Sequence, residues 1–415
     1  MKDAPAPDST VARALAVLGI TQIAAWGSLF YAMALVGPRI RLETGWSDTL
    51  VFGGFSVALV TSGLAAPLAG RLIDRHGGRP VLTAGSLLGA AGLALLATSH
   101  GAAWYLASWA VIGVAMAGAL YDPAFATLAQ LAGPRTRTAI SLLTLAGGFA
   151  STVSWPLTLW MLGRLDWRDV LLVHAAGQAL LCAPLHAFAL PTRPRTGGAA
   201  PASPRPPDDG ARSSTRRAGL DWTALGLFAL VVAAHGFVTS ALSVHLVRLL
   251  DMLGLSEGQA VIAGVFIGPA QVGARLLELL FGSRLSALGL GVVATAMLPF
   301  AFALLYGAEP STAVAILFAL IYGASNGLIT IARGVVPLAL FSRDRYGEVL
   351  GLIAAPALAT KSAAPILFAV FMIGWGANGT VALCGALGIL AAGAMLVLGA
   401  VRRRAGDALE PPLSR

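Results

Sequence analysis

The sequence predicts an all-α membrane protein with twelve transmembrane helices in two six-helix bundles. Of its 415 residues, 57% are hydrophobic and only 11% are charged, which is too little charge to cover a water-soluble protein of this size. The apolar residues form runs of roughly 20 residues, the length that crosses a bilayer as a helix. Short polar turns separate these runs, and one proline-rich segment divides them into two sets of six.

Each span is expected where an apolar run reaches the length of one crossing. The first six lie near residues 12–38, 48–70, 80–98, 103–131, 138–162 and 169–190. The second six lie near residues 222–249, 258–282, 286–306, 311–338, 347–373 and 377–401. A kink is expected in the fifth span at Trp155-Pro156, because proline removes a backbone hydrogen bond from a helix.

A proline-rich segment separates the two sets. Six prolines fall between residues 191 and 218, and a helix cannot run through so many of them. We therefore expect a six-helix bundle over residues 1–190, an irregular cytoplasmic linker over 191–218, and a second six-helix bundle over 219–415. Residues 1–10 are polar, and no small-residue cleavage site follows the first apolar run, so this run is expected to be a retained helix.

The positive charges predict the orientation of the spans. Most of the 28 Lys and Arg residues fall in the terminal segments, the linker and the turns on that same side of the membrane. The other side is expected to carry only Arg39, Arg41, Arg164, Arg168 and Arg248. Because cytoplasmic loops collect Lys and Arg, both termini of this multi-pass protein are expected in the cytoplasm.

Several other classes of protein do not fit the sequence. The net charge of +9 could suggest nucleic acid as a partner, but the basic residues form no stripe with aromatic residues between them. Cys182 and Cys384 lie inside apolar runs without the spacing of metal ligands, so no disulfide framework, metal site or cofactor is predicted. No Gly-x-x-x-x-Gly-Lys-Ser/Thr run occurs, so an ion gradient rather than ATP is expected to drive the protein.

The turn between the second and third spans, Gly70–Arg79, follows the pattern Gly-x-Leu-x-Asp-Arg-x-Gly-x-Arg. It resembles the signature loop of the major facilitator superfamily of secondary transporters, departing only at Gly78, where that family usually has a basic residue. The resemblance implies two bundles that rock around a central site. It also implies a set of gating residues in this loop: Gly70, Asp74, Arg75, Gly77 and Arg79. Asp74 is expected near the start of the eleventh span, where the helix dipole favours a negative charge.

Two further motifs bear on the substrate. The stretch Gly45-Trp46-Ser47, together with the loop at Gly70, resembles the monocarboxylate and oxalate–formate branch of the superfamily. The fifth span carries Gly147-Gly148 but lacks the fuller glycine–proline signature of drug antiporters. The first resemblance implies a small organic anion as substrate, and the second departure disfavours drug efflux.

Charged side chains inside a bilayer are costly, so each is a candidate for function. Arg275 lies deep in the eighth span, where a guanidinium can hold a carboxylate through two parallel hydrogen bonds. Transporters of the monocarboxylate branch are similar in using an arginine on that helix to bind the anion. The alternative is that Glu278, three residues further on the same face, neutralises Arg275; Glu278 is also a candidate proton carrier.

Lys361 lies near the middle of the eleventh span, between Pro356 and Pro365. Broken helices at this depth are where transporters build substrate sites, and a buried lysine can load and release a proton. Lys361 is therefore a candidate for substrate binding. The alternative is a permanent ion pair with Asp122 or Glu278.

Asp122 in the fourth span has two candidate roles. In the superfamily an acid here commonly clasps basic residues of the signature loop, here Arg75 or Arg79, which implies gating. Proton carriage is the alternative. Arg333, near the cytoplasmic end of the tenth span, is expected to reach the membrane interface or to cap its helix.

Four uncharged or weakly charged side chains complete the candidate set. His235, near the middle of the seventh span, is a candidate proton relay, with packing as the alternative. Tyr31, Tyr121 and Asn326 are candidates to line a substrate cavity, and helix packing explains each of them equally well.

Together these residues predict a monomeric, proton-coupled symporter of a bacterial inner membrane. The excess of Arg275, Lys361 and Arg333 over two carboxylates favours a small organic anion such as a monocarboxylate. The expected partners are this small molecule, protons and membrane lipid. An efflux transporter for a drug or an arsenical is the alternative. A membrane enzyme or receptor without transport activity is more remote, because the histidines have no acidic partner at helical spacing.

Overall fold

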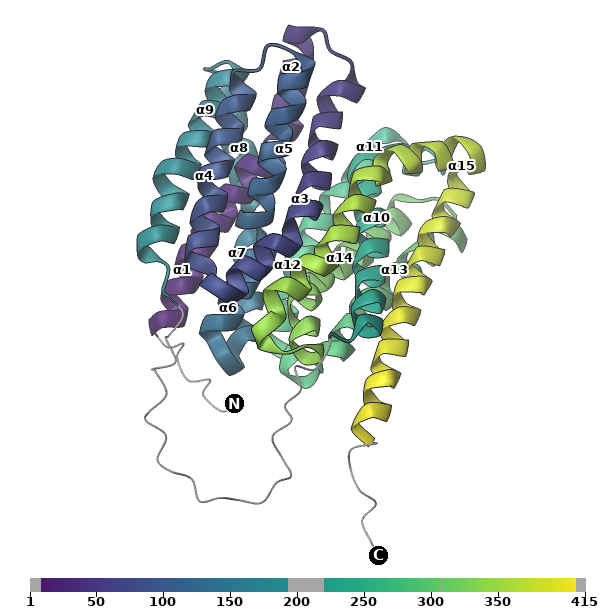
Figure 1. The fold of residues 1–415 in the computed structure, drawn as a ribbon. Coiled ribbons are helices and arrows are strands. Elements are labelled where there is room, and N and C mark those ends of the chain that lie inside the picture. The colour runs from purple at the N-terminus through teal and green to yellow at the C-terminus, as the bar shows by residue number, and fades with distance from the viewer. Residues whose placement is uncertain (1–8, 193–219, 308, 408–415) are drawn as a thin grey trace, which may run out of the picture.

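A computed structural model describes residues 9–192, 220–307 and 309–407, and every regular element among them is a helix. Residues 9–192 are termed the N-terminal half and residues 220–407 the C-terminal half. Figure 1 shows the two halves as groups of helices, one coloured purple to teal and the other green to yellow. The first helix begins and the last helix ends at the end of the molecule where the described chain breaks off after residue 192. We term this the linker end and the other the opposite end.

The N-terminal half is built from nine α-helices, three π-helices and one 3₁₀ turn among its described residues. They are α1 (Ser9–Ala25), η1 (Trp26–Tyr31), α2 (Met33–Thr44), α3 (Asp48–His76), α4 (Gly78–Ala97), α5 (Ala102–Ala119), α6 (Tyr121–Ala132), η2 (Gly133–Arg135), α7 (Thr136–Gly147), α8 (Ala150–Leu162), α9 (Trp167–Gly177), η3 (Gln178–Cys182) and η4 (Leu185–Ala189). The π-helix η1 continues α1 into α2, and widened turns of this kind are frequent at functional sites.

The C-terminal half has fewer and longer elements. They are α10 (Trp222–Met252), α11 (Glu257–Val265), α12 (Ile267–Phe281), η5 (Gly282–Arg284), α13 (Ala287–Gly307), α14 (Thr312–Leu340), η6 (Arg343–Arg345) and α15 (Tyr346–Asp407). Side chains of Asp221, Ser256 and Ser311 accept hydrogen bonds from the first turns of α10, α11 and α14, which explains where these helices begin.

Ten helical stretches in the described ranges are long and apolar enough to cross a membrane. Two of them, residues 102–162 and 343–402, are 61 and 60 residues long. A straight helix of that length would measure about 90 Å, far more than the ~30 Å of bilayer hydrocarbon. α15 reverses at Gly376, whose backbone is not helical (φ 67°, ψ −173°), and Figure 1 shows its two arms. In the other stretch the chain leaves α6 through Gly133 (φ 51°) at the linker end.

Two helices of the N-terminal half are interrupted. Leu120 has an extended backbone (φ −87°, ψ −155°) and separates α5 from α6. The fifth predicted span is interrupted at Gly148 and Phe149, between α7 and α8, whereas α8 continues through Pro156. The interruption of this span therefore lies earlier than the predicted site at Trp155-Pro156. The helix is interrupted beside the glycine pair Gly147-Gly148 instead. Glycine has a lower helix propensity than any other residue of this span except proline.

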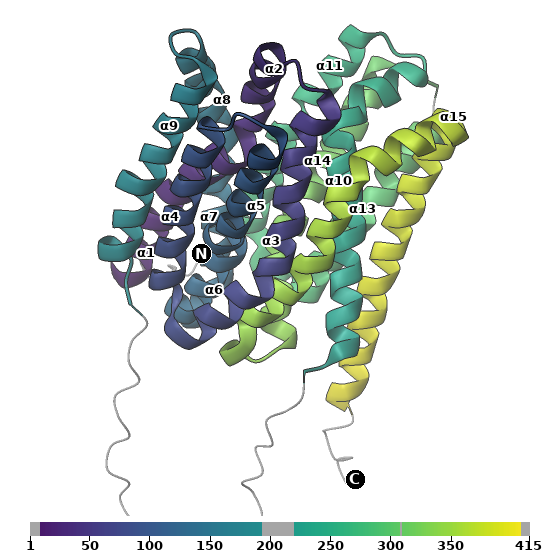
Figure 2. The same ribbon diagram turned by 45° about the horizontal axis from the view of Figure 1, so that its top comes forward.

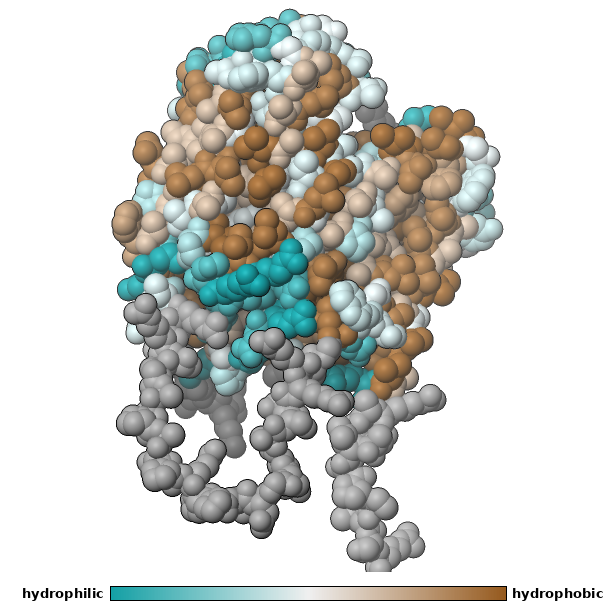
Figure 3. Space-filling model, in the orientation of Figure 1, coloured by the Kyte–Doolittle hydropathy of each residue, from teal (hydrophilic) through white to brown (hydrophobic). Residues whose placement is uncertain are grey.

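Buried apolar side chains form three large clusters, one of which both halves share. The shared cluster lies toward the linker end and includes Phe125 and Ile140 of the N-terminal half with Phe228 and Tyr346 of the C-terminal half. The other two clusters lie toward the opposite end, each within one half. Figure 3 shows apolar side chains over the middle of the molecule and hydrophilic ones at the linker end.

α3 and the first arm of α15 lie side by side where the halves meet (Figures 1 and 2). A Cβ atom on Gly70 would lie 1.9 Å from the carbonyl oxygen of Gly347, and one on Gly351 would lie 2.3 Å from that of Ala66. No side chain fits at either position without moving a backbone. Glycine therefore allows the two helices to close the linker end by direct backbone contact.

Candidate functional site

The charged groups inside the helices gather where the two halves face each other. Asp122 lies in the first turn of α6, Arg275 in α12, Arg333 in α14 and Lys361 in the first arm of α15. The N-terminal half supplies the carboxylate and the C-terminal half supplies the three cations. This arrangement brings together the intramembrane charges that the sequence singled out, but not in the pairs that it predicted.

Arg275 reaches from the C-terminal half toward α7 of the N-terminal half. Its Nη1 donates to the carbonyl oxygen of Thr144 at 3.0 Å, and its Nη2 lies 3.5 Å from the hydroxyl oxygen of Thr330. No carboxylate in the described ranges lies within 4.0 Å of the guanidinium, and its buried Nε has no partner there. Arg275 is only 6% exposed, so its guanidinium and the unused donor lie in a largely dry place.

A pair of glycines makes room for this guanidinium. A Cβ atom on Gly148 would lie 2.7 Å from Nη1 of Arg275. A Cβ atom on Gly147 would lie 2.3 Å from the hydroxyl oxygen of Tyr121. Any larger residue at these two positions would displace a polar group of the site, so the glycine pair of the fifth predicted span positions both side chains.

Glu278 does not neutralise Arg275, and that expectation is wrong. Its Oε1 accepts a hydrogen bond from Nε of Arg137 at 3.0 Å, and its Oε2 accepts one from the hydroxyl of Ser141 at 2.5 Å. Both donors belong to α7, so this ion pair joins the two halves. The carboxylate is 3% exposed and turns toward the helix that offers two donors, rather than along its own helix toward Arg275.

Asp122 forms an ion pair with Arg333, again between the halves. Neither Arg75 nor Arg79 pairs with it; Arg79 donates instead to the carbonyl oxygen of Leu190 at 3.0 and 2.6 Å. The predicted clasp onto the signature loop is therefore wrong, as is the expectation that Arg333 reaches the interface or caps its helix. The break before α6 places Asp122 at the start of a helix that packs against α15 of the C-terminal half as well as against α3 and α4, and its carboxylate meets Arg333.

Lys361 packs along α10, where a Cβ atom on Gly236 would lie 2.9 Å from its Cε. The charges of Arg333 and Asp122 both act on its ammonium group. No carboxylate within the described ranges lies within 4.0 Å of it, so the alternative of a permanent ion pair with Asp122 or Glu278 is wrong. Lys361 is thus a second cation without a direct counter-ion.

An aromatic cluster of the N-terminal half borders the guanidinium of Arg275. Tyr31 and Tyr121 lie close enough for the charge of Arg275 to act on their hydroxyl groups. The ring of Trp26 is 5.0 Å from that of Tyr121 and 6.1 Å from that of Tyr31, and Trp155 is 6.2 Å from Tyr31. Rings beside a cation offer an apolar surface to an organic molecule whose charged end the cation binds.

The remaining predicted residues lie on the C-terminal half. His235 is 2% exposed, and its Nε2 lies 3.1 Å from the hydroxyl of Ser325, which donates to the carbonyl oxygen of Ala294. This placement favours the packing alternative for His235. Asn326 is half-buried on α14, one turn before Thr330 and on the same face. It therefore lies beside the Arg275 site.

The signature loop contacts the start of α15. The two carboxylate oxygens of Asp74 accept hydrogen bonds from the backbone N–H groups of Gly347 and Glu348, each at 2.8 Å. The first turn of a helix has unpaired N–H groups and a positive dipole end, so a carboxylate is stabilised there. Gly77 ends α3 with φ 81°, a left-handed conformation that favours glycine. The predicted latch requires this contact of Asp74; its gating role stays a prediction.

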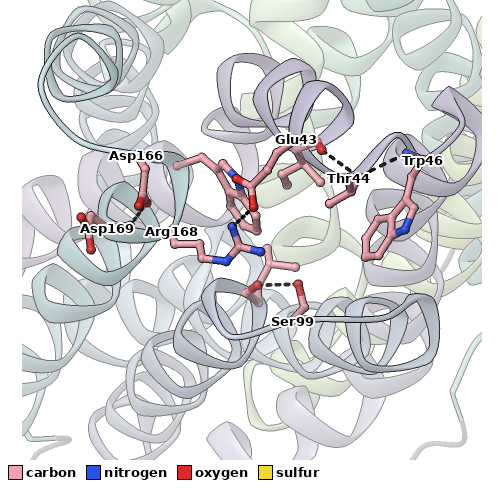
Figure 4. Close-up of polar contacts among 10 residues, drawn as sticks. Glu43, Thr44, Trp46, Ser99, Asp166, Arg168 and Asp169 are labelled. Carbon is pink, nitrogen blue, oxygen red and sulfur yellow. Dashed lines mark hydrogen bonds and ion pairs between the residues drawn. The ribbon is translucent and has the colours of Figure 1, made fainter.

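The opposite end is held by contacts within one half. Figure 4 shows Glu43, at the end of α2, facing Arg168 at the start of α9. Glu43 also accepts a hydrogen bond from Nε1 of Trp167, and Arg41 pairs with Asp48 at 3.0 Å. All five residues belong to the N-terminal half. Across the described ranges, no ion pair joins the two halves at this end.

Four residues of the site were not predicted as functional: Arg137, Ser141, Thr144 and Thr330. From the sequence, Arg137 is only one of the basic residues expected in the cytoplasmic turns. Ser141 and Thr144 follow it by four and seven residues, so the three share one face of α7. This polar stripe on an apolar helix was the signal that could have identified them.

Known proteins match the chain at the level of sequence. The family profile described as Major Facilitator Superfamily matches residues 18–278. Multidrug resistance protein MdtH of Enterobacter sp. (strain 638) is 32% identical over 171 residues, covering 39% of this chain and 40% of that protein. Multidrug resistance protein MdtL of Klebsiella pneumoniae (strain 342) is 31% identical over 169 residues, covering 39% and 42%. The chain thus spans about two fifths of the length of these curated relatives.

Solved structures match over nearly the whole chain. The human organic anion transporter MFSD10 (TETRAN) superposes with a TM-score of 0.70 at 18% identity, covering 94% of this chain and 100% of that one. The proton:xylose symporter XylE superposes with a TM-score of 0.72 at 15% identity, covering 94% and 96%. At these identities the likeness concerns the fold alone.

Proposed function

The chain belongs to the Major Facilitator Superfamily, and we propose that it is a proton-driven exporter of organic anions that combine a negative group with an apolar body. The observation that carries this proposal is the uncompensated positive charge where the halves meet. Both carboxylates there, Asp122 and Glu278, are already paired with arginines. Arg275 and Lys361 have no carboxylate within 4.0 Å in the part of the chain that the structure describes. A negatively charged solute would supply the missing counter-charge.

Arg275 is the anchor for the negative group. Its buried Nε is unpartnered, and a guanidinium can hold a carboxylate or sulfonate through two parallel hydrogen bonds. Thr330 and Asn326, on the adjacent face of α14, add neutral donors beside it. Lys361 supplies a second positive charge that draws the anion toward this part of the bundle.

The aromatic cluster receives the apolar body of the solute. Trp26, Tyr31 and Trp155 follow one another along the N-terminal half, and Trp155 is 46% exposed. A flat apolar molecule can stack on these rings while its charged end reaches Arg275. Such a molecule resembles a drug more than it resembles a metabolite with a few carbon atoms.

The direction of transport is proposed from the relatives. The curated proteins that match over about two fifths of their length are named multidrug resistance proteins, and removal of a compound from the cell is what resistance requires. Proton-coupled uptake of a small monocarboxylate is the second candidate. It is favoured by the 6% exposure of Arg275, which leaves little room for a bulky group next to the guanidinium itself.

The transport cycle follows from two rigid units. We take residues 1–190 and 219–415 as six-helix bundles with twelve crossings in all, joined by a linker over 191–218 and embedded in a bacterial inner membrane with both termini cytoplasmic. The linker end is then the cytoplasmic end. The described arrangement is closed there, through Asp74 on α15 and through Arg137 with Glu278. Opening it requires these contacts to break as the bundles rock.

Protons are coupled through the pair of Asp122 and Arg333. The anion binds Arg275 while Asp122 is deprotonated and paired with Arg333. After the solute has left, protonation of Asp122 removes the charge that holds Arg333 across the halves and lets the empty bundles return, so that solute and proton are exchanged. His235 lies outside this exchange, because its ring is bound within the C-terminal half.

Three probes of graded chemistry test the proposal: naphthalene-2-sulfonate, the naphthyl-methylammonium cation of similar shape, and lactate. A ligand of the folded state raises its melting temperature. We expect stabilisation by the sulfonate, and its accumulation in inside-out proteoliposomes when their interior is acidified. Stabilisation and accumulation of lactate alone would support the second candidate. Stabilisation by the ammonium alone would contradict an anion site.

Two variants test the anchor itself. Arg275→Met should weaken binding of the sulfonate about tenfold to a hundredfold, because a hydrogen-bonded charge contributes about 1.5–3 kcal/mol. Gly148→Ala should weaken it as well, since its methyl group would lie 2.7 Å from Nη1 of Arg275. Gly177→Ala is the matched control, because nothing lies within 4 Å of a Cβ atom there. Equal affinity for the sulfonate in the unmodified protein and in all three variants would exclude Arg275 as the anchor.

A further inference from the structure

A groove outside the transport site opens on the outer face of the N-terminal half. It has a volume of about 280 Å³ and is lined by residues of α3, α4 and α5. Leu68 and Leu72 of α3 stand on one side and Leu88 of α4 on the other, all of them exposed. His76 is the one ionisable residue among its lining side chains, and it lies at the groove's linker end.

Small residues create the depth of this groove. A Cβ atom on Gly85 would lie 2.6 Å from the backbone of Gly118, so α4 and α5 touch there without side chains between them. Ala65, Ala69 and Ala84 line the same depression. The leucines on its two sides project beyond a floor of glycine and alanine, which leaves an apolar groove between them.

The groove faces the hydrocarbon of the bilayer. Its walls belong to two stretches that are long and apolar enough to cross a membrane, Asp48–His76 and Gly78–Ala97. Figure 3, in the same orientation as Figure 1, shows apolar side chains on this side directly above a band of hydrophilic side chains at the linker end. An apolar groove in this position is filled by an acyl chain of the surrounding lipid.

Positive charge gathers at one end of the groove. Arg71 and Arg75 follow Leu68 by three and seven residues, so they continue its side of α3 toward the linker end, and both are exposed. No ion pair in the described part of the chain involves either of them. The neighbouring carboxylate of Asp74 is turned away toward α15. The guanidinium groups of Arg71 and Arg75 and the imidazole of His76 therefore border the place where a lipid headgroup would lie.

We propose that this groove binds one acyl chain of an anionic phospholipid whose headgroup phosphate contacts Arg71, Arg75 and His76. The groove receives the acyl chain but does not distinguish one lipid from another, because their chains are equally apolar. Selection among lipids therefore comes from the headgroup, where each basic side chain near the membrane surface contributes about 1 kcal/mol of attraction to anionic lipid. This lipid binds on the lipid-facing surface of the N-terminal half, away from the transport site. Its binding therefore does not depend on which solute is transported.

The experiment compares two lipids with identical acyl chains. The purified full-length protein is placed in nanodiscs containing phosphatidylglycerol and phosphatidylethanolamine, and the lipids that remain bound after release are counted by native mass spectrometry. We expect one phosphatidylglycerol to be retained in preference to phosphatidylethanolamine. Arg71→Gln and Arg75→Gln should each lower that preference roughly fivefold. Equal retention of the two lipids by the unmodified protein would overturn the proposal.

A further variant tests the apolar groove rather than the charge at its end. Ala84→Leu places three extra carbon atoms in the groove and should lower retention of both lipids alike. Ala91→Leu is the matched control, because Ala91 is equally exposed on α4 but lies outside the groove. Arg39→Gln, an exposed site at the opposite end, controls for loss of charge. Undiminished retention in Ala84→Leu, at an unchanged melting temperature, would show that no acyl chain occupies the groove.

Discussion

The linker end and the opposite end of the molecule are held together in different ways. At the linker end the polar contacts run between the halves, from Asp74 to α15 and from Arg137 to Glu278. One apolar cluster there is shared by both halves. At the opposite end the contacts stay within a half, as Glu43 and Arg168 do, and each half has an apolar cluster of its own.

This difference teaches which interactions the transport cycle must break. In a transporter whose bundles rock, contacts within a bundle persist, while contacts between bundles form in one state and are lost in the other. In the proposed cycle the ion pair in Figure 4 stabilises a rigid unit, whereas Asp74 and Arg137 stabilise one of the two states. Removing the two kinds of contact should have different consequences.

The largest effect is expected from Arg137→Met. It leaves the 3%-exposed carboxylate of Glu278 without its cation, and breaking a buried ion pair costs about 3–5 kcal/mol. The linker end should open, and hydrogen–deuterium exchange in α7 and α12 should rise. The double variant with Glu278→Gln removes the unpaired charge and should recover part of the protection. Unchanged exchange in Arg137→Met would mean that this pair does not hold the closed state.

A smaller effect is expected from Asp74→Asn. The substitution replaces a carboxylate that accepts two backbone hydrogen bonds by a neutral amide with only one acceptor oxygen. Bonds to a charged group contribute about 1.5–3 kcal/mol, so the first turn of α15 should exchange faster and transport should slow. Substrate affinity should stay the same, and a loss of affinity alone would count against the latch. Asp251→Asn, an exposed site at the opposite end, is the control.

The next effect concerns the backbone contact of α3 with α15. Gly70→Ala adds a methyl group 1.9 Å from the carbonyl oxygen of Gly347, and overpacking of this kind costs about 1–3 kcal/mol. The closed state should be less populated, which the reactivity of a cysteine introduced at the linker end would report. Gly53→Ala lies on the same helix with nothing within 4 Å of its Cβ atom and should behave like the unmodified protein.

The smallest effect is expected from Glu43→Gln. The ion pair with Arg168 is 47% exposed at the glutamate, and exposed pairs contribute about 0–1 kcal/mol. The melting temperature should fall slightly, while transport rate and the exchange of α15 should not change. A shift of the closed state as large as that of Asp74→Asn would remove the distinction between the two ends.

Much of the fold could be predicted from local features of the chain. The apolar runs between 48 and 98 correspond to α3 and α4 within a few residues, because helix length in a bilayer depends on hydrophobic length alone. The break in the fifth predicted span was misplaced, since both Gly148 and Pro156 weaken a helix and only packing chooses between them. Arg137 could not be predicted as a site residue, because it becomes the partner of Glu278 only when α12 lies against α7.

The sequence by itself determined that this chain is helical, crosses a membrane and carries a signature loop with Asp74 near the start of a later helix. These properties depend on the length of apolar runs, the scarcity of charge and a local motif. The tertiary structure alone decided the ion pairs, which join residues 141 and 211 positions apart. A helix determines which side chains share a face, but only the packing of the bundle determines which helix that face meets. For that reason Glu278 pairs with Arg137 rather than with Arg275, and Arg275 is left without a carboxylate partner in the proposed anion site.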